Sequence, residues 1–145
     1  MSQAPARPAE WSHFQHGADI GVRGAGPTKA VAFEQTALAL FAAVTTLDRI
    51  APKTVIEIDC SAPNDALLLA DWLNALIFRM AVDRMLFSRF EVELNGNRLT
   101  GRAWGEPVDR ERHEPAVEPK GATYTNLSVR QQPDGSWLAE CVVDV

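Results

Sequence analysis

The chain has 145 residues, of which 46% are hydrophobic, enough for one domain with a buried core. Its 14 basic and 19 acidic residues give a net charge of −5, which argues against a protein that holds nucleic acid by neutralising phosphates. We therefore expect the partner to be a protein or a metal ion.

The first ten residues are rich in proline and alanine and lack the apolar run of a signal peptide. We expect residues 1–10 to form a disordered tail and residues 11–145 to form a single domain. No later run approaches the roughly 18 apolar residues of a membrane span. Cys60 and Cys141 are too few for a disulfide framework and lack the CxxC spacing of a zinc site. Both are predicted to be buried, reduced thiols of a cytoplasmic protein.

The first predicted strand covers residues 13–21, where apolar side chains alternate with others, and it continues to a glycine- and proline-rich turn at residues 24–27. Thr28 follows in the position of a helix cap. Apolar residues then recur at helical spacing from Phe33 to Val44, which predicts one helix with a single apolar face.

A half-buried strand is predicted at residues 55–60, and Asn64 after it is placed to cap a second helix that runs to about residue 84. The apolar surface of this second helix is so broad that we expect it to be covered on two sides. It is the expected centre of the core.

The last third of the chain has the two-residue period of strands. Residues 86–94 and 98–104 form one predicted hairpin, and residues 123–130 and 137–145 form a second. The charged, proline-punctuated segment 106–119 between them has a length that suggests function or mobility more than packing. The expected order is strand, helix, strand, helix and four strands, an α+β single domain with two helices packed on antiparallel β-sheet.

Candidate metal ligands occur near the two ends of the chain. Asp19 lies near the end of the first predicted strand, shortly before Gly21, and an aspartate between a strand and a glycine-rich turn is usually a turn former that hydrogen-bonds its own backbone. The chain closes with Asp144 and the carboxylate of Val145. If the last strand pairs beside the first, three oxygen-bearing groups converge, a set that suits Ca²⁺ or Mg²⁺ and not zinc.

Other polar residues give weaker signals. Lys120 precedes a predicted strand, where a lysine is usually a surface charge or a stem packed over an aromatic neighbour. His13, His16 and His113 have no serine or cysteine nucleophile paired to them by a recognisable motif. Residues 24–29 lack the spacing of a phosphate-binding loop, so we do not expect this chain to bind a nucleotide by itself.

Blocks along most of the chain resemble the archease family. They read FQHGADIG at 14–21, ALALF at 37–41, DALLLADWLN at 65–74, GE at 105–106, K with TY at 120–124, and VVDV at 142–145. Two departures stand out: Gly17, where the family usually has threonine, and Thr125, where it usually has histidine.

The resemblance implies that Asp19, Asp144 and Val145 bind a divalent cation, Ca²⁺ or else Mg²⁺ or Mn²⁺, and that Lys120 contacts the partner enzyme or its nucleotide chemistry. It also implies a function: a non-enzymatic activator of a GTP-dependent tRNA-splicing RNA ligase, which promotes guanylation of the ligase and repeated turnover. The alternative is a stand-alone metal-dependent hydrolase or small-molecule enzyme that uses the same carboxylates. The absence of a nucleophile–base pair and the small size favour the activator.

Overall fold

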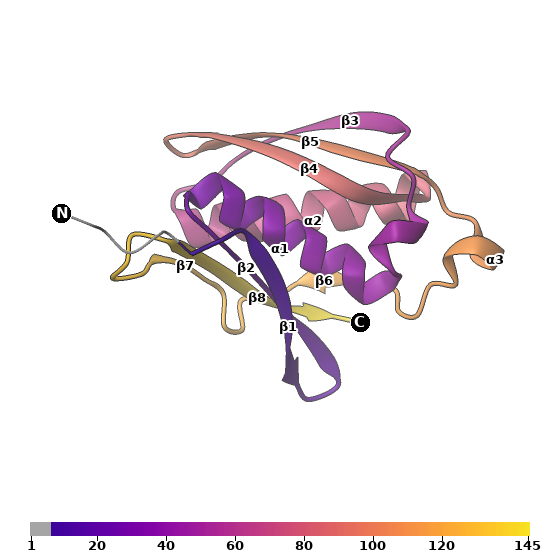
Figure 1. Ribbon diagram of the computed structural model, residues 1–145, viewed down its shortest axis with the longest axis horizontal. Coiled ribbons are helices and arrows are strands. Elements are labelled where there is room, and N and C mark those ends of the chain that lie inside the picture. The colour runs from indigo at the N-terminus through magenta and orange to yellow at the C-terminus, as the bar shows by residue number, and fades with distance from the viewer. Residues whose placement is uncertain (1–6) are drawn as a thin grey trace.

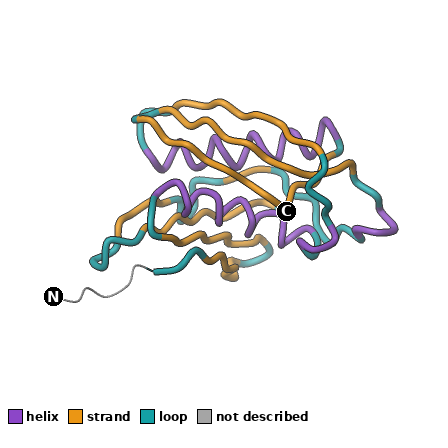
Figure 2. Tube along the Cα trace, turned by 45° about the horizontal axis from the view of Figure 1, so that its top comes forward, coloured by secondary structure: helices purple, strands orange, loops and turns teal. Residues whose placement is uncertain are grey.

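Two long helices lie between two antiparallel sheets in the computed structural model, which describes residues 7–145 (Figure 1). The same layering is visible in the turned view of Figure 2. The helices are α1 (Lys29–Val44) and α2 (Asp65–Asp83), and the short elements η1 (Leu47–Arg49) and α3 (Arg110–His113) lie in connections. None of the helices in the described part of the chain is long and apolar enough to cross a membrane.

The sheet below the helices in Figure 1 joins the two ends of the chain. Its strands are β1 (Glu10–His16), β2 (Asp19–Gly26), β6 (Gly121–Ala122), β7 (Ser128–Gln131) and β8 (Trp137–Asp144). The order is β1-β2-β8-β6, and β7 also pairs with β8. The second sheet has the order β3-β5-β4 and consists of β3 (Thr54–Ser61), β4 (Met85–Asn95) and β5 (Arg98–Pro107).

The predicted caps begin both long helices. The Thr28 hydroxyl accepts a hydrogen bond from the N–H of Val31 at 3.1 Å, and the Asn64 side-chain oxygen accepts one from the N–H of Leu67 at 2.9 Å. Each bond satisfies a backbone donor that has no partner within its own helix. These local signals explain why the starts of the helices could be predicted well.

Aromatic side chains fill the space between the helices and the β3-β5-β4 sheet. Trp72 is fully buried on α2, donates its ring N–H to the Phe33 carbonyl of α1 at 3.1 Å, and meets Phe90 edge to face. A Cβ at Gly101 would lie 2.5 Å from the Trp72 ring, so only glycine lets the strand approach so closely. The expectation that α2 is covered on two sides is confirmed, because α2 contacts strands of both sheets.

The structure confirms the α+β class with antiparallel sheets but corrects three details. The strand predicted over residues 13–21 is a hairpin, because Gly17 takes a left-handed conformation (φ +58°) and turns β1 back onto β2. The strands form two separate sheets. Residues 123–127 are irregular, with Asn126 at φ +53°, so the strand predicted at 123–130 is confined to β7.

The tail predicted at residues 1–10 lies largely outside the described residues. Glu10, at its end, is the first residue of β1 and forms an ion pair with Arg7.

Candidate functional site

Asp19 and Asp144 meet at one end of the β2–β8 pair. The two strands are antiparallel, and the register that pairs Ile20 with Val143 brings Asp19 opposite Asp144 one residue further on. Residues directly opposite on antiparallel strands point their side chains to the same face. The prediction that the strand of Asp19 lies beside the last strand is therefore confirmed.

Main-chain hydrogen bonds bring the other two candidate residues to the same place. The N–H of Val145 donates to a carboxylate oxygen of Asp19 at 3.4 Å. The N–H of Lys120 donates to the carbonyl of Asp144 at 2.8 Å, just before Gly121 pairs with Asp144 in β6. All four residues predicted from the sequence thus lie at this end of the sheet, with the Lys120 and Asp144 side chains exposed and that of Asp19 half-buried.

The donor set fits a hard cation. Asp19 and Asp144 form no ion pair with a lysine, arginine or histidine anywhere in residues 7–145, so their charge is not compensated within the described chain. The same residues contain no group of three or more His, Cys, Asp or Glu side chains arranged to hold a metal. Two carboxylates alone leave a cation poorly coordinated, so further oxygens, from main-chain groups or water, would have to extend the set.

A surface hollow of about 480 Å³ opens beside Asp19. It is lined by residues of the β1–β2 hairpin and the end of α1: His13, Phe14, Gln15, Gly17, Asp19, Ile20, Ala42 and Ala43. His13 is a structural residue here, because its ring Nε2 bonds to the Ala39 carbonyl at 2.7 Å and ties β1 to α1. Asp19 is the acidic residue in this lining, so the hollow leaves room for water or a partner group next to that carboxylate.

Thr125, which stands where the resemblance leads us to expect histidine, is held through its main chain. The Thr125 carbonyl accepts a hydrogen bond from the N–H of Val142 at 3.2 Å, and the Thr125 N–H donates to the Thr123 hydroxyl at 3.1 Å. The irregular segment is thus attached to β8, and the exposed side-chain position is occupied by threonine.

The segment predicted to be a functional or mobile loop is held by a buried ion network. Glu106 is 2% exposed and accepts hydrogen bonds from Arg112 at 2.6 and 2.8 Å and from the N–H of Ala51 at 2.8 Å. His113 is fully buried, and its Nδ1 accepts the N–H of Asp109, so Nε2 donates to Glu106 at 2.9 Å. The Arg112 hydrogen bonds hold the pKa of Glu106 well below its usual range, against the effect of its burial.

The expectation that function or mobility matters more than packing for residues 106–119 needs a correction, because the part up to His113 is packed around Glu106. The sequence pattern does not reveal this packing, because the Arg112 partner of Glu106 lies six residues away across a turn. The spacing of Glu106 to Arg112 and His113 is the signal that could have indicated the network.

Neither cysteine is placed to act as a nucleophile. Burial raises the pKa of the Cys141 thiol to about 11 and that of Cys60 to about 11, so both are protonated at neutral pH. Both thiols are free. Cys141 is buried as predicted, whereas Cys60 is only partly so.

Comparisons with known proteins agree along nearly the whole chain. The sequence model of the archease protein family matches residues 11–145. A protein archease of Methanopyrus kandleri is 40% identical over 139 residues, which cover 93% of this chain and 99% of the relative. A protein archease of Pyrococcus furiosus is 36% identical over 140 residues, covering 94% and 99%.

Solved structures support the fold. The solution structure of Methanobacterium thermoautotrophicum protein 1598 superposes with a TM-score of 0.81 at 28% identity and covers 93% of this chain and 98% of that one. A Thermotoga maritima crystal structure, described as an archease and possible chaperone, superposes with a TM-score of 0.61 over 99% and 100% of the two chains. At 16% identity, the second similarity supports the fold alone.

Proposed function

Because the chain belongs to the archease family, we propose that it is an accessory protein that activates a GTP-dependent tRNA-splicing RNA ligase. In this proposal the protein promotes guanylation of the ligase and its repeated turnover, and it carries out no covalent chemistry itself. The proposal includes a divalent cation, Ca²⁺ or else Mg²⁺ or Mn²⁺, held by Asp19, Asp144 and Val145, and an accessory role for Lys120.

The observation that carries this proposal is the meeting of two uncompensated carboxylates with a lysine at the exposed end of one sheet. Asp19 and Asp144 lie opposite each other, and the Lys120 main chain is bonded to Asp144. The position is open to a partner, since Lys120 and Asp144 are exposed. Residues at the ends of paired strands hold their spacing well, and such preorganised charges suit the stabilisation of charge that develops elsewhere.

A divalent cation, when bound, would supply a compact positive charge that can neutralise phosphate oxygens of a partner's nucleotide. The chain's own residues would hold that charge at the surface. The Lys120 ammonium adds a second positive group nearby on a flexible stem, able to reach an anionic group in the partner. Catalysis of phosphoryl and nucleotidyl transfer depends mainly on such positioning and charge stabilisation.

The stand-alone hydrolase receives less support. His13 is bonded to the Ala39 carbonyl, His113 is bonded within the Glu106 network, and the two thiols have raised pKa values. His16, opposite Asp19 in the β1–β2 hairpin, and Lys120 are then the proton-carrying groups left near the carboxylates. Both are exposed, and no serine or cysteine nucleophile accompanies them within residues 7–145, so the hydrolase receives less support than the activator.

The experiment that separates the two classes uses radiolabelled GTP under multiple-turnover conditions. The cognate RNA ligase is incubated alone and with this protein, and this protein is also incubated alone. The proposal predicts faster labelling of the ligase in the mixture and no label on this protein. A label on this protein, or no change in the ligase, contradicts the proposal.

A further inference from the structure

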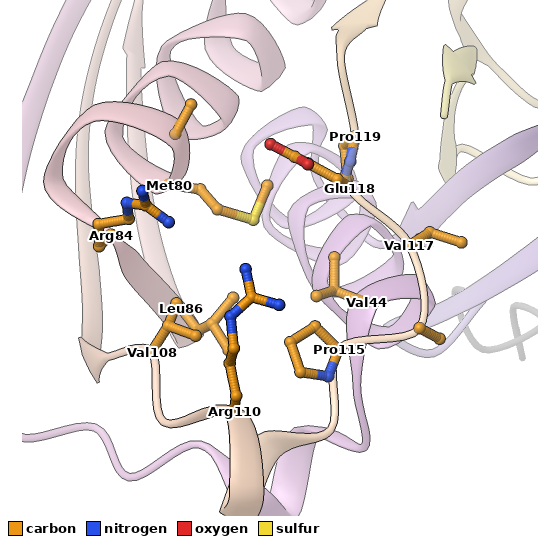
Figure 3. Close-up of a pocket in the computed structure, with 12 residues that line it drawn as sticks. Val44, Met80, Arg84, Leu86, Val108, Arg110, Pro115, Val117, Glu118 and Pro119 are labelled. Atoms are coloured by element: carbon orange, nitrogen blue, oxygen red, sulfur yellow. The ribbon is translucent and has the colours of Figure 1, made fainter.

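A second cavity, away from Asp19, lies where the carboxyl ends of α1 and α2 approach the segment after α3. Its volume is about 520 Å³, within the range of protein binding pockets. Apolar side chains make up much of its wall (Figure 3): Val44, Met80, Leu86, Val108, Pro115 and Val117. Glu118 and Pro119, which precede Lys120, form one rim.

Two arginines without partners face this cavity. Arg110 extends toward Met80 from α3, and Arg84 lies beside Met80 at the end of α2 (Figure 3). Neither guanidinium forms a hydrogen bond or an ion pair with any other residue in the described range 7–145. Their neighbours in sequence do: Arg79 pairs with Asp83, and Arg112 pairs with Glu106. In a chain of net charge −5, two unpaired cations at one cavity are notable.

The backbone of Arg84 is unusual. It has φ +56° and ψ +46° after the last turn of α2, a left-handed position where glycine is the usual residue. Its carbonyl accepts the N–H of Val108 at 2.8 Å, which fixes the residue against the cavity wall. A non-glycine residue in this conformation is strained, and such strain is most often kept where the side chain has a use.

An exposed apolar stripe on α2 continues from the cavity. Phe78 is 61% exposed and Val82 is 60% exposed, four residues apart on one face of the helix. Ala81 is exposed beside both and also lines the cavity. The apolar wall and the stripe therefore form one surface, which we call the α2 surface: Phe78, Ala81, Val82 and the cavity with Arg84 and Arg110.

We propose that the α2 surface docks a segment of the partner ligase that inserts an apolar side chain into the cavity and places carboxylates on Arg84 and Arg110. This inference rests on the proposed function and names a second contact for it. Charge complementarity decides the occupant, since the arginines are the unpaired cations at the rim. A phosphate of RNA or a nucleotide fits less well, because the wall beside the arginines is largely apolar, with Met80, Leu86 and Val108, and a phosphate group has no apolar part to bury against it.

The first test is photo-cross-linking in the full-length protein. With p-benzoylphenylalanine in place of Phe78, irradiation with the purified ligase is expected to give a cross-link to a ligase peptide that contains aspartate or glutamate. The matched control carries the same group in place of Val55, which is 48% exposed on β3 and lies outside the α2 surface. The control is expected to give no cross-link to the ligase. Cross-links from position 55 alone, or to RNA added with the ligase, would overturn the inference.

The second test measures the Kd of the ligase by calorimetry for Arg84→Gly and Arg110→Glu. Each variant is expected to bind at least about tenfold more weakly. Arg84→Gly should do so while its Tm rises, because glycine relieves the backbone strain, so weak binding cannot come from unfolding. Wild-type affinity in both variants contradicts docking here while leaving the activator proposal intact; failure of the wild-type protein to bind the ligase contradicts both.

Discussion

A carboxylate oxygen of Asp19 accepts a hydrogen bond from the N–H of Val145, 126 residues later in the chain, at 3.4 Å. This contact exists because β2 and β8 are neighbours in one sheet. It joins Val145 to the candidate cation site at Asp19.

A carboxy-terminal extension of the chain should weaken Ca²⁺ binding by at least about tenfold, since it converts the terminal carboxylate of Val145 into a neutral amide. The fold should persist, because Val145 lies beyond β8. Calorimetric titration of Ca²⁺ into carboxy-tagged, amino-tagged and untagged protein measures this. Equal affinities in all three would mean that the free end of Val145 supplies no ligand.

Removing the buried carboxylate of Glu106 should lower the free energy of unfolding by about 3 kcal/mol, because Arg112 and His113 lose a hydrogen-bonded anion in a nearly water-free position. Urea unfolding of Glu106→Ala gives the value. Glu93→Ala, on an exposed position of β4, is the control and should change stability by less than about 0.5 kcal/mol. A loss in Glu106→Ala as small as in the control would show that the network contributes nothing.

The stabilisation from Glu106 should also depend on pH. Its pKa in the folded protein lies below the ordinary value of 4.5, so the native state favours the charged form. The contribution is present above pH 4.5 and is lost as the pH falls toward the folded pKa. Urea unfolding from pH 7 to pH 3 gives the difference in the free energy of unfolding between wild type and Glu106→Gln. This difference should shrink below pH 4.5. A difference that grows on acidification would contradict the assignment.

Replacing the strained Arg84 by glycine should raise the free energy of unfolding by about 1 kcal/mol. Arg79→Gly, in the interior of the same helix, should lower it by about 1 kcal/mol. Thermal and urea unfolding measure the change in the free energy of unfolding of each variant relative to wild type. The two changes should have opposite signs if the left-handed backbone of Arg84 costs stability. Two losses of similar size would mean that the Arg84 stem contributes more packing than its backbone costs.

Local chemistry decided which features could be predicted from the sequence. Thr28 and Asn64 are caps whose function depends on three neighbouring residues, so both helix starts were predicted from position alone. Gly17 shows the limit: the alternation of residues 13–21 looks like one strand, and only pairing of His16 with Asp19 reveals the turn. The division of the strands into two sheets depends on distant partners, which periodicity does not encode.

The candidate site could be predicted only in part, because its residues come from distant parts of the chain. Asp19 and Asp144 could be related only by assuming that their strands pair, and the family resemblance supplied their role. The burial of Glu106 was not predicted, because the segment around it is rich in charged residues, which are usually exposed. Arg84 and Arg110 come from separate segments, and only the folded chain brings them to one cavity.

The measurement that tests the central claim most directly is the initial rate of ligase guanylation with Asp19→Asn in place of the wild-type protein. The change removes one charge with little change of shape, so the fold should remain, as circular dichroism can verify. We predict that stimulation of the ligase falls at least about tenfold, since the oxygen set loses a charged ligand. Undiminished stimulation by folded Asp19→Asn would contradict the claim that the carboxylates beside Val145 carry the function.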